Sequence, residues 1–282
     1  MTPRVVRMAV RRQVSLPDGR AVVVHDTGEA GRPALLWHHG SPQTGALLAP
    51  VVAAAAARGM RVLSAARPSY GGSTPRPGRD VASVAADLAA VLDACEVDTV
   101  LTMGASGGGP HALACAALLP GRVTGAVCIA GVAPYEDAPD WWGGMAAPGG
   151  LRSALGGRAA RARYAETDEF DATIFVDADW AALDTTWAPL GQDAQRAEQD
   201  GDDGLVDDDV AFVTPWGFSL EDVGVPVLVV QGLLDRVVPP AHGDRLVRGL
   251  PLGELWVRPR DGHVAVLDAV PVALDWGRAL AV

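Results

Sequence analysis

The stretch "LTMGASGGGPHALACAALLP" (Leu101–Pro120) decides the fold of this 282-residue chain. Apolar residues run into Gly104–Gly109, where a single serine, Ser106, stands among glycines, and a Leu/Ala-rich helical pattern follows at once. Glycine tolerates positive φ and close backbone approach, so it collects where a turn is unusually sharp. The stretch therefore predicts a strand, a tight turn with Ser106 at its apex, and a helix.

Two interpretations of this turn compete. Ser106 can simply cap the helix, or it can be a nucleophile held out for attack, since Gly104–Gly108 fits the G-x-S-x-G elbow. A phosphate-binding loop is excluded, because the stretch has no G-x-G-x-x-G in frame and the chain has no lysine for G-K-[ST]. The rest of the chain has to distinguish the two.

A serine hydroxyl is a poor nucleophile and needs a base that a third group orients. Both partners follow later strand patterns: Asp235 lies after "VPVLVVQG" and His263 after "ELWVR". The order Ser106, Asp235, His263 is the one that an elbow of this type uses. Asp261 is an alternative acid, but its position two residues before His263 leaves it little freedom to reach Nδ1, so Asp235 is favoured.

A developing oxyanion needs two backbone N–H groups. Gly107, which follows the serine, is one expected donor, and Ser41 in "LLWHHGSPQTG" (Leu35–Gly45) is the other. The neighbouring His38 and His39 do not suggest a metal pair, because adjacent residues on a strand point to opposite faces. We expect them to be structural.

Strand-like and helix-like runs alternate along the chain, which is typical of a mostly parallel sheet flanked by helices, an α/β fold. The opening hairpin has an Asp-Gly turn. The expected strands are 12–16, 21–26, 34–38, 61–65, 99–103, 123–129, 225–231 and 254–258, and the expected helices are 47–58, 81–94, 108–119, 241–250 and a last one that closes the chain.

Residues 134–216 break this alternation, with helical and irregular sequence and five tryptophans. They hold 18 Asp and Glu against 5 Arg, whereas the rest of the chain holds 16 against 18. We expect a helical, acidic, Trp-rich cap at 134–216, inserted into a core formed by 1–133 and 217–282. The run "DGDDGLVDDD" (Asp200–Asp209) lacks the spacing of a calcium loop, and we expect it to be a solvated acidic face.

These motifs together resemble the α/β-hydrolase-fold serine hydrolases. The H-G-x-P loop at 39–42, "RPSYGGST" at 67–74, the elbow, the acid loop and the "DGH" loop at 261–263 fall in that family's order. The resemblance covers about 12–133 and 217–282. It implies that Ser106 is the nucleophile, His263 the general base, Asp235 the orienting acid, and the amides of Ser41 and Gly107 the oxyanion donors.

The substrate pocket is less defined. Its candidates are Ala105, where many relatives carry a larger residue, Tyr70 of the glycine-rich loop, and Trp141 and Trp142 of the insertion. Epoxide hydrolases and haloalkane dehalogenases resemble the chain too, but they carry Asp at the elbow, so the serine indicates acyl chemistry. Of the other histidines, we expect His111 to be buried and His242 to lie at the surface.

The expected activity is hydrolysis of a carboxylic ester or lactone of a small hydrophobic substrate, neutral or cationic, through an acyl-enzyme and without cofactor or metal. Alternatives on the same triad are an aminopeptidase resembling the proline iminopeptidases and a carbon–carbon bond hydrolase. A non-catalytic ligand-binding protein of this fold is a further alternative, against which the intact triad argues.

The composition also indicates the compartment and the partners. The chain has no apolar run long enough for a membrane span, no signal-peptide pattern, and three cysteines without a CxxC pair. We therefore expect a cytoplasmic protein that binds neither membrane nor nucleic acid. Homo-oligomerisation remains open.

Overall fold

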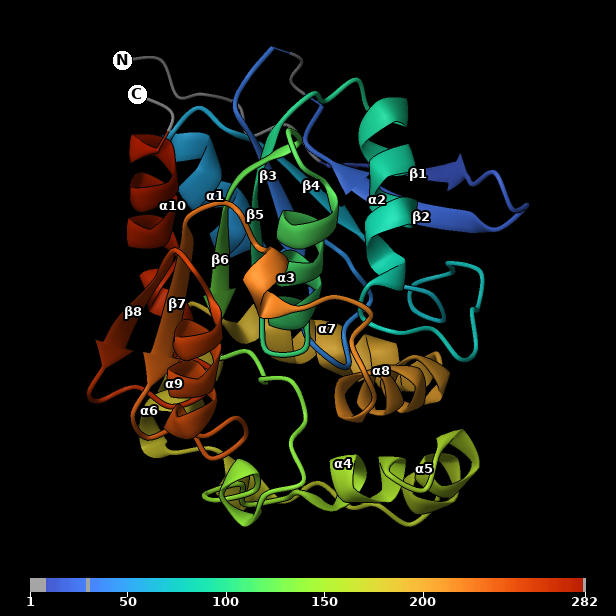
Figure 1. The fold of residues 1–282 in the computed structure, drawn as a ribbon, viewed down its shortest axis with the longest axis vertical. Coiled ribbons are helices and arrows are strands. Elements are labelled where there is room, and N and C mark those ends of the chain that lie inside the picture. Colours follow the sequence, from blue (N-terminus) through green and yellow to red (C-terminus); the bar gives the residue numbers. More distant parts are fainter. Residues whose placement is uncertain (1–8, 29–30, 281–282) are drawn as a thin grey trace.

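A single sheet of eight strands forms the centre of the computed structural model, which describes residues 9–28 and 31–280 (Figure 1). The strand order is β1-β2-β4-β3-β5-β6-β7-β8, and every pair from β4 to β8 is parallel. The expected mostly parallel sheet is confirmed. The strands are β1 (Val10–Ser15), β2 (Ala21–Asp26), β3 (Ala34–His38), β4 (Arg61–Ala65), β5 (Val100–Ala105), β6 (Val123–Ile129), β7 (Val227–Gly232) and β8 (Gly253–Arg258).

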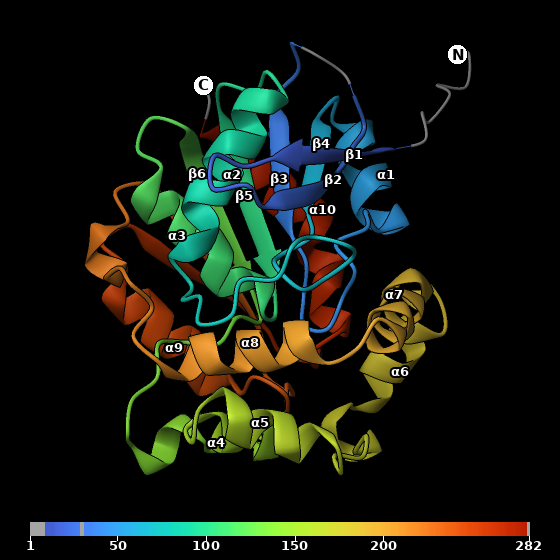
Figure 2. The ribbon, with the colours of Figure 1, turned by 90° about the vertical axis from the view of Figure 1, so that its right-hand side faces the viewer.

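Helices cover both faces of this sheet. One face packs against α2 (Ser83–Ala94), α3 (Gly108–Leu118) and α9 (Pro240–Gly249), and the other against α1 (Ala49–Ala57) and α10 (Val270–Ala279) (Figures 1 and 2). The inner strands β3, β5 and β7 are therefore buried along their whole length and consist mostly of apolar residues. In β7, for example, Val227 and Val229 face one layer while Leu228 and Val230 face the other.

The chain between β6 and β7, all of which the structure describes, consists of short helices joined by loops and contains no strand. Helix α8 (Asp203–Val213) crosses the end of the sheet at which the parallel strands finish, and α4 (Gly149–Ala154) and α5 (Arg158–Ala165) pack on the far side of α8 (Figure 2). We call residues 134–216 the cap segment. It contains α4 (Gly149–Ala154), α5 (Arg158–Ala165), α6 (Asp177–Leu183), α7 (Ala188–Gln199), α8 (Asp203–Val213) and two 3₁₀ turns, Pro139–Trp141 and Ala172–Ile174. Two more 3₁₀ turns, Leu220–Asp222 and Ala265–Ala269, lie in the core.

Most element boundaries follow the sequence pattern. The strands expected at 21–26, 34–38, 61–65 and 123–129 form with those bounds. The seventh strand begins at Val227 rather than at 225, because Pro226 has no N–H to donate to the ladder. β5 continues to Ala105, directly up to the serine.

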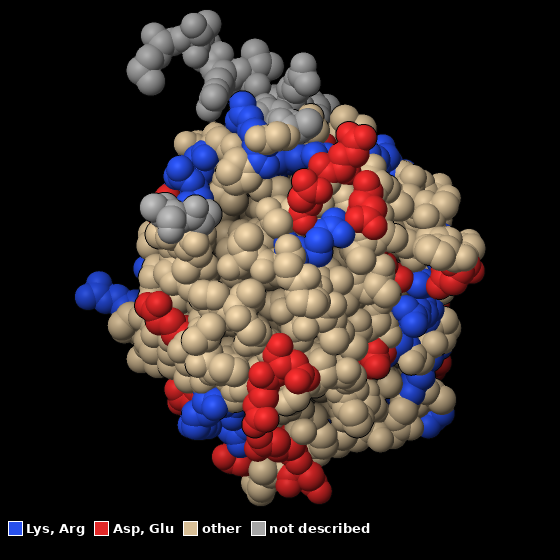
Figure 3. All heavy atoms as spheres, turned by 45° about the horizontal axis from the view of Figure 1, so that its top comes forward, with Lys and Arg blue, Asp and Glu red and all other residues tan. Residues whose placement is uncertain are grey.

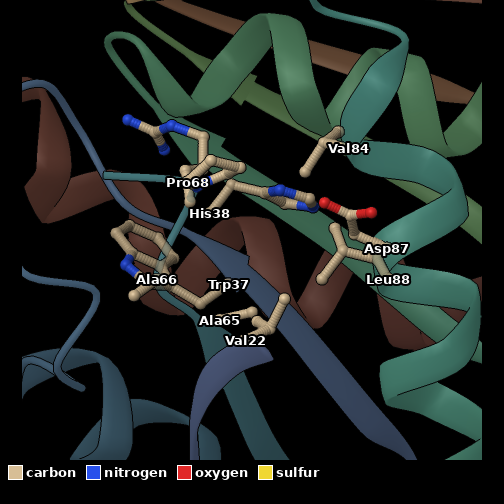
Figure 4. A pocket seen from close by; sticks show the side chains of 10 residues that line it. Val22, Trp37, His38, Ala65, Ala66, Pro68, Val84, Asp87 and Leu88 are labelled. Atoms are coloured by element: carbon tan, nitrogen blue, oxygen red, sulfur yellow. The ribbon is translucent and has the colours of Figure 1, made fainter. Parts of the chain in front are cut away.

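A small cavity of about 10 Å³ lies between the sheet and α2. Figure 4 shows His38 and Asp87 extending toward each other across it. Its volume is that of about one water molecule, so it has no room for a substrate. No helix among the described residues has both the length and the apolar character needed to cross a bilayer.

Candidate active site

The turn between β5 and α3 is a strained elbow. Ser106 has φ of 51°, a left-handed conformation that is uncommon for residues other than glycine. Its N–H donates to the Ile129 carbonyl at 2.9 Å. The glycines that follow are required by close approach: a Cβ on Gly107 would lie 2.3 Å from Ser41 Oγ, and one on Gly108 would lie 2.1 Å from the His38 carbonyl oxygen. The surrounding structure therefore holds Ser106 in a conformation that costs of order 1–3 kcal/mol.

The elbow, the acid loop and the histidine loop meet at one point. His263 Nε2 lies 2.9 Å from Ser106 Oγ, and His263 Nδ1 lies 2.8 Å from Asp235 Oδ2. The other carboxylate oxygen of Asp235 accepts the N–H groups of Val237 and Val238, both at 2.9 Å. The acid thus has its orientation fixed by its own loop. It fixes the imidazole in turn, with Nε2 free to take the serine proton.

The charge state of His263 depends on two carboxylates. Burial lowers the pKa of His263, but the charge and hydrogen bond of Asp235, together with the charge of Asp179, outweigh burial and raise the pKa above 6.5. A base with a pKa near the working pH combines a useful neutral fraction with a strong affinity for the proton that it takes.

Asp261 does not contact His263, although it lies only two residues before it in the sequence. It accepts a hydrogen bond from Arg258 Nε at 2.6 Å. The structure therefore brings Asp235, and not Asp261, to the imidazole.

The residues that carry the two expected oxyanion donors, Ser41 and Gly107, are close together, because a Cβ on Gly107 would lie 2.3 Å from Ser41 Oγ. Neither backbone N–H donates a hydrogen bond within the part of the chain that the structure describes. The preceding N–H, that of Gly40, is taken by Gln43 Oε1 at 2.5 Å. Both N–H groups are therefore available to a ligand, and binding the negative oxygen of a tetrahedral intermediate takes two such donors.

His38 and His39 hold the loop that carries Ser41. His38 Nε2 lies 2.7 Å from Thr102 Oγ1, and burial, with a smaller contribution from Arg67, lowers the pKa of His38 to about 3. His39 Nε2 accepts the backbone N–H of Arg67 at 3.1 Å, so Nδ1 carries the proton that is donated to the Gly40 carbonyl at 2.8 Å. Over residues 9–28 and 31–280, no group of three or more His, Cys, Asp and Glu side chains is placed to hold a metal ion.

The acidic run of the cap segment is only partly the solvated face that we expected, because Asp200, Asp202 and Asp203 are exposed and the second half of the run is not. Asp207, Asp208 and Asp209 of α8 are all buried. Asp208 accepts hydrogen bonds from Arg67 at 2.7 Å and from Arg79 at 2.5 Å, and also from Tyr70 at 2.9 Å and Ser41 Oγ at 2.5 Å. Burial alone would raise the pKa of Asp208, but the two guanidinium groups hold it well below its ordinary value. The expectation fails because these partners come from distant loops.

The candidate pocket residues have mostly other contacts. Tyr70 is 3% exposed, with its hydroxyl on Asp208, and Trp141 is 0% exposed, with its indole N–H on the Pro134 carbonyl at 3.0 Å. Neither side chain offers surface to a substrate in this structure, which corrects the expectation for these two. Trp142 lies against the Arg152 guanidinium, 4.6 Å from the ring centroid, and Ala105 ends β5 with 6% exposure.

The remaining histidines divide. His111 is buried, as expected, with Nδ1 2.8 Å from the Gly107 carbonyl, so it supports the elbow from below. The expectation of a surface position for His242 is wrong. It is 0% exposed, accepts the Ala133 N–H at 3.1 Å and makes an edge-to-face contact with the Trp141 ring, 4.8 Å between centroids.

Three cap residues near the site escaped the sequence analysis: Asp179, Asp208 and Phe212. A Cβ on Gly107 would lie 3.1 Å from Phe212 Cζ, so this ring of α8 covers the elbow directly. Gly262 in "DGH" was a possible signal for Asp179, because a Cβ there would lie 2.0 Å from Asp179 Oδ2. Nothing in the local sequence identifies the other two.

A family model described as alpha/beta hydrolase fold matches residues 33–270. The chain belongs to this family. It is 27% identical over 247 residues to a non-heme chloroperoxidase of Streptomyces lividans, covering 81% of this chain and 83% of that one. It is 28% identical over 268 residues to a 2-hydroxy-6-oxononadienedioate/2-hydroxy-6-oxononatrienedioate hydrolase of Cupriavidus pinatubonensis, covering 90% and 89%. Bacillus anthracis bromoperoxidase has a similar fold, with a TM-score of 0.73, 24% identity and coverage of 96% and 98%.

Proposed function

We propose that this α/β hydrolase is a serine hydrolase that cleaves a carboxylic ester or lactone through an acyl-enzyme. The observation that carries the proposal is the chain of contacts from Ser106 Oγ through His263 to Asp235, at 2.9 and 2.8 Å, on a serine with φ of 51°. Fold alone does not fix function, but this arrangement supplies an activated nucleophile.

The proposed reaction has two halves. Ser106 Oγ attacks the carbonyl carbon while His263 Nε2 takes the hydroxyl proton, and the N–H groups of Ser41 and Gly107 bind the negative oxygen. The intermediate collapses, His263 gives its proton to the leaving alkoxide, and the acyl group stays on Ser106. Water then attacks the acyl-enzyme with His263 again as the base, which releases the acid and restores the serine.

We propose a small, hydrophobic substrate that is neutral or cationic. The cap segment holds 18 Asp and Glu against 5 Arg, and Phe212 of its helix α8 lies against the elbow. Five of those carboxylates are buried and bonded (Asp179, Asp193, Asp207, Asp208 and Asp209), so only the others can act on an approaching ligand. Their sign disfavours anionic substrates. On the face that Figure 3 shows, acidic side chains gather in two runs, one near the top and one at the bottom, with basic side chains beside both, and most of the other surface is uncharged.

A carbon–carbon bond hydrolase is the second candidate. It is favoured by the 28% identity to the Cupriavidus hydrolase over 90% of this chain. The same triad would serve, with a carbon leaving group in place of an alkoxide.

A substrate panel separates these candidates. Short-chain and medium-chain esters, lactones, aminoacyl arylamides and a 2-hydroxy-6-oxodienoate are assayed side by side, with Ser106→Ala as the blank. Turnover of neutral esters or lactones well above the other classes supports the proposal. Preferential cleavage of the oxodienoate assigns the second candidate, and turnover that persists in Ser106→Ala contradicts both.

A further inference from the structure

A fully buried carboxylate of the cap segment contacts the loop that carries the base. Asp179 of α6 is 0% exposed. Its Oδ1 accepts the N–H groups of Val264 at 2.7 Å and Ala265 at 2.9 Å, and its Oδ2 accepts the N–H of Val176 at 3.1 Å. Val264 directly follows His263, so one carboxylate joins α6 to the catalytic loop.

Gly262, which precedes His263, also lies against the Asp179 carboxylate. A Cβ on Gly262 would lie 2.0 Å from Asp179 Oδ2, a distance that no side chain can accept. Asp179 therefore touches the backbone on both sides of His263. This glycine provides room for the carboxylate, since its φ is not in the left-handed region.

Asp179 differs from the other buried carboxylates of the cap segment. Asp193 of α7 also reaches the core, accepting the Thr44 N–H at 3.0 Å and hydroxyl at 2.6 Å, but it is paired with Arg196. Asp207, Asp208 and Asp209 each have an arginine as well. No arginine or histidine forms an ion pair with Asp179 in the described part of the chain. Only N–H dipoles stabilise its charge, so no cation cancels its field at His263.

We propose that Asp179 is a positioning residue for His263, which holds the catalytic loop to the cap and supports the protonated form of the base. The inference rests on the proposed function for its kinetic consequences but not for its structural ones. In this proposal the position of His263 depends on how α6 packs against the core.

The electrostatic environment of His263 agrees with this role. The charged groups that act on it are Asp235, from the loop after β7, and Asp179, from α6, while the elbow contributes the neutral Ser106 hydroxyl. Burial lowers the pKa of His263 and both carboxylates raise it. Removal of the Asp179 charge must therefore lower this pKa.

The test compares Asp179→Asn with Asp193→Asn, two isosteric changes of buried cap carboxylates that accept N–H groups from the core. The His263 imidazole is titrated by NMR, with its signal assigned by its loss in His263→Gln, and kcat and KM are measured against pH. In Asp179→Asn we expect the NMR titration and the rising limb of kcat/KM to move to lower pH. We expect kcat to fall by about 10²-fold, the cost of misplacing a catalytic group by about 1 Å, with little change in KM.

Asp193→Asn is expected to lower stability and to leave the His263 titration unmoved. An unchanged titration in Asp179→Asn, or an equal shift in Asp193→Asn, overturns the inference. If Asp179→Asn does not fold, Gly262→Ala replaces it, because its methyl group must displace the carboxylate. That variant should lower kcat by a similar factor, and wild-type kcat in it overturns the inference as well.

The two proposals fail in different ways. The NMR titration needs no turnover, so a chain that hydrolyses none of the panel substrates but shows the shift in Asp179→Asn retains the positioning role and loses the proposed function. If the protein hydrolyses esters but Asp179→Asn does not shift the His263 titration, the proposed function stands and the positioning role is wrong.

Discussion

The elbow and helix α8 lie against each other, but the local sequence predicts the structure of the elbow and does not predict the burial of the acidic residues in α8. At the elbow the backbone conformation decides the sequence. Ser106 adopts a left-handed turn and its neighbours must be glycine, so a few consecutive residues are enough to predict the site. In α8 the same short length carries Asp207–Asp209, which read as a solvated run but are buried. The charge of Asp208 is balanced by Arg67 and Arg79, which lie more than 120 residues earlier in the chain.

The largest expected effect lies at the elbow. Ser106→Ala should reduce hydrolysis by on the order of 10⁶-fold, as loss of a triad nucleophile does, with little loss of stability. Ser69→Ala is the matched control, since Ser69 also has a positive φ, of 72°, and only a 3.3 Å contact to Asp207. Steady-state kinetics check both. Comparable losses in the two variants would mean that the elbow serine has no special role.

The choice of acid gives the next largest effect. Asp235→Asn should lower kcat by about 10⁴-fold, because the amide favours the wrong imidazole tautomer. Asp261→Asn removes only the 2.6 Å contact with Arg258 and should change kcat far less. The pair is compared in one ester assay, and a reversed order would reassign the acid to Asp261.

A third prediction concerns α8 and its stability. Asp208→Asn leaves two buried guanidinium groups without their carboxylate, so it should reduce the free energy of unfolding by about 3–5 kcal/mol. Asp203→Asn, on the same helix, removes a carboxylate that is 70% exposed and paired with Arg158, for which about 0–1 kcal/mol is expected. Urea unfolding measures both. Equal losses of unfolding free energy in the two variants would contradict the conclusion that buried ion pairs hold Asp208 of α8 in place.

The smallest expected effect concerns the exposed carboxylates of the cap segment. Because its buried carboxylates are already bonded, steering should be modest: a neutral ester should exceed a matched anionic one in kcat/KM by up to about tenfold at low salt. The gap should narrow as salt screens the exposed charges. An anionic ester that reacts as fast as the neutral one, without any salt effect, would leave the cap segment no role in selecting substrates by charge.

These differences explain which parts of the molecule could be predicted. The strands and the mostly parallel character of the sheet follow from the alternation of apolar runs with helical ones, and the elbow follows from glycine. The approach of Asp235 to His263 follows from the order of loops at one edge of a parallel sheet. The burial of Asp208 and the contact of Asp179 with the loop after His263 depend on how the cap segment docks. No local pattern encodes that docking, so acidic residues there look alike whether they are solvated or buried.

The most direct test of the account is the chemical identity of the nucleophile. The intact protein is treated with a fluorophosphonate, and the adduct is counted and located by mass spectrometry, with His263→Ala treated in parallel. The account predicts one adduct per chain, on the peptide that carries Ser106, with the rate of labelling greatly reduced in His263→Ala. An adduct on another serine, such as Ser41 or Ser69, or labelling of Ser106 at the same rate without His263, would contradict it.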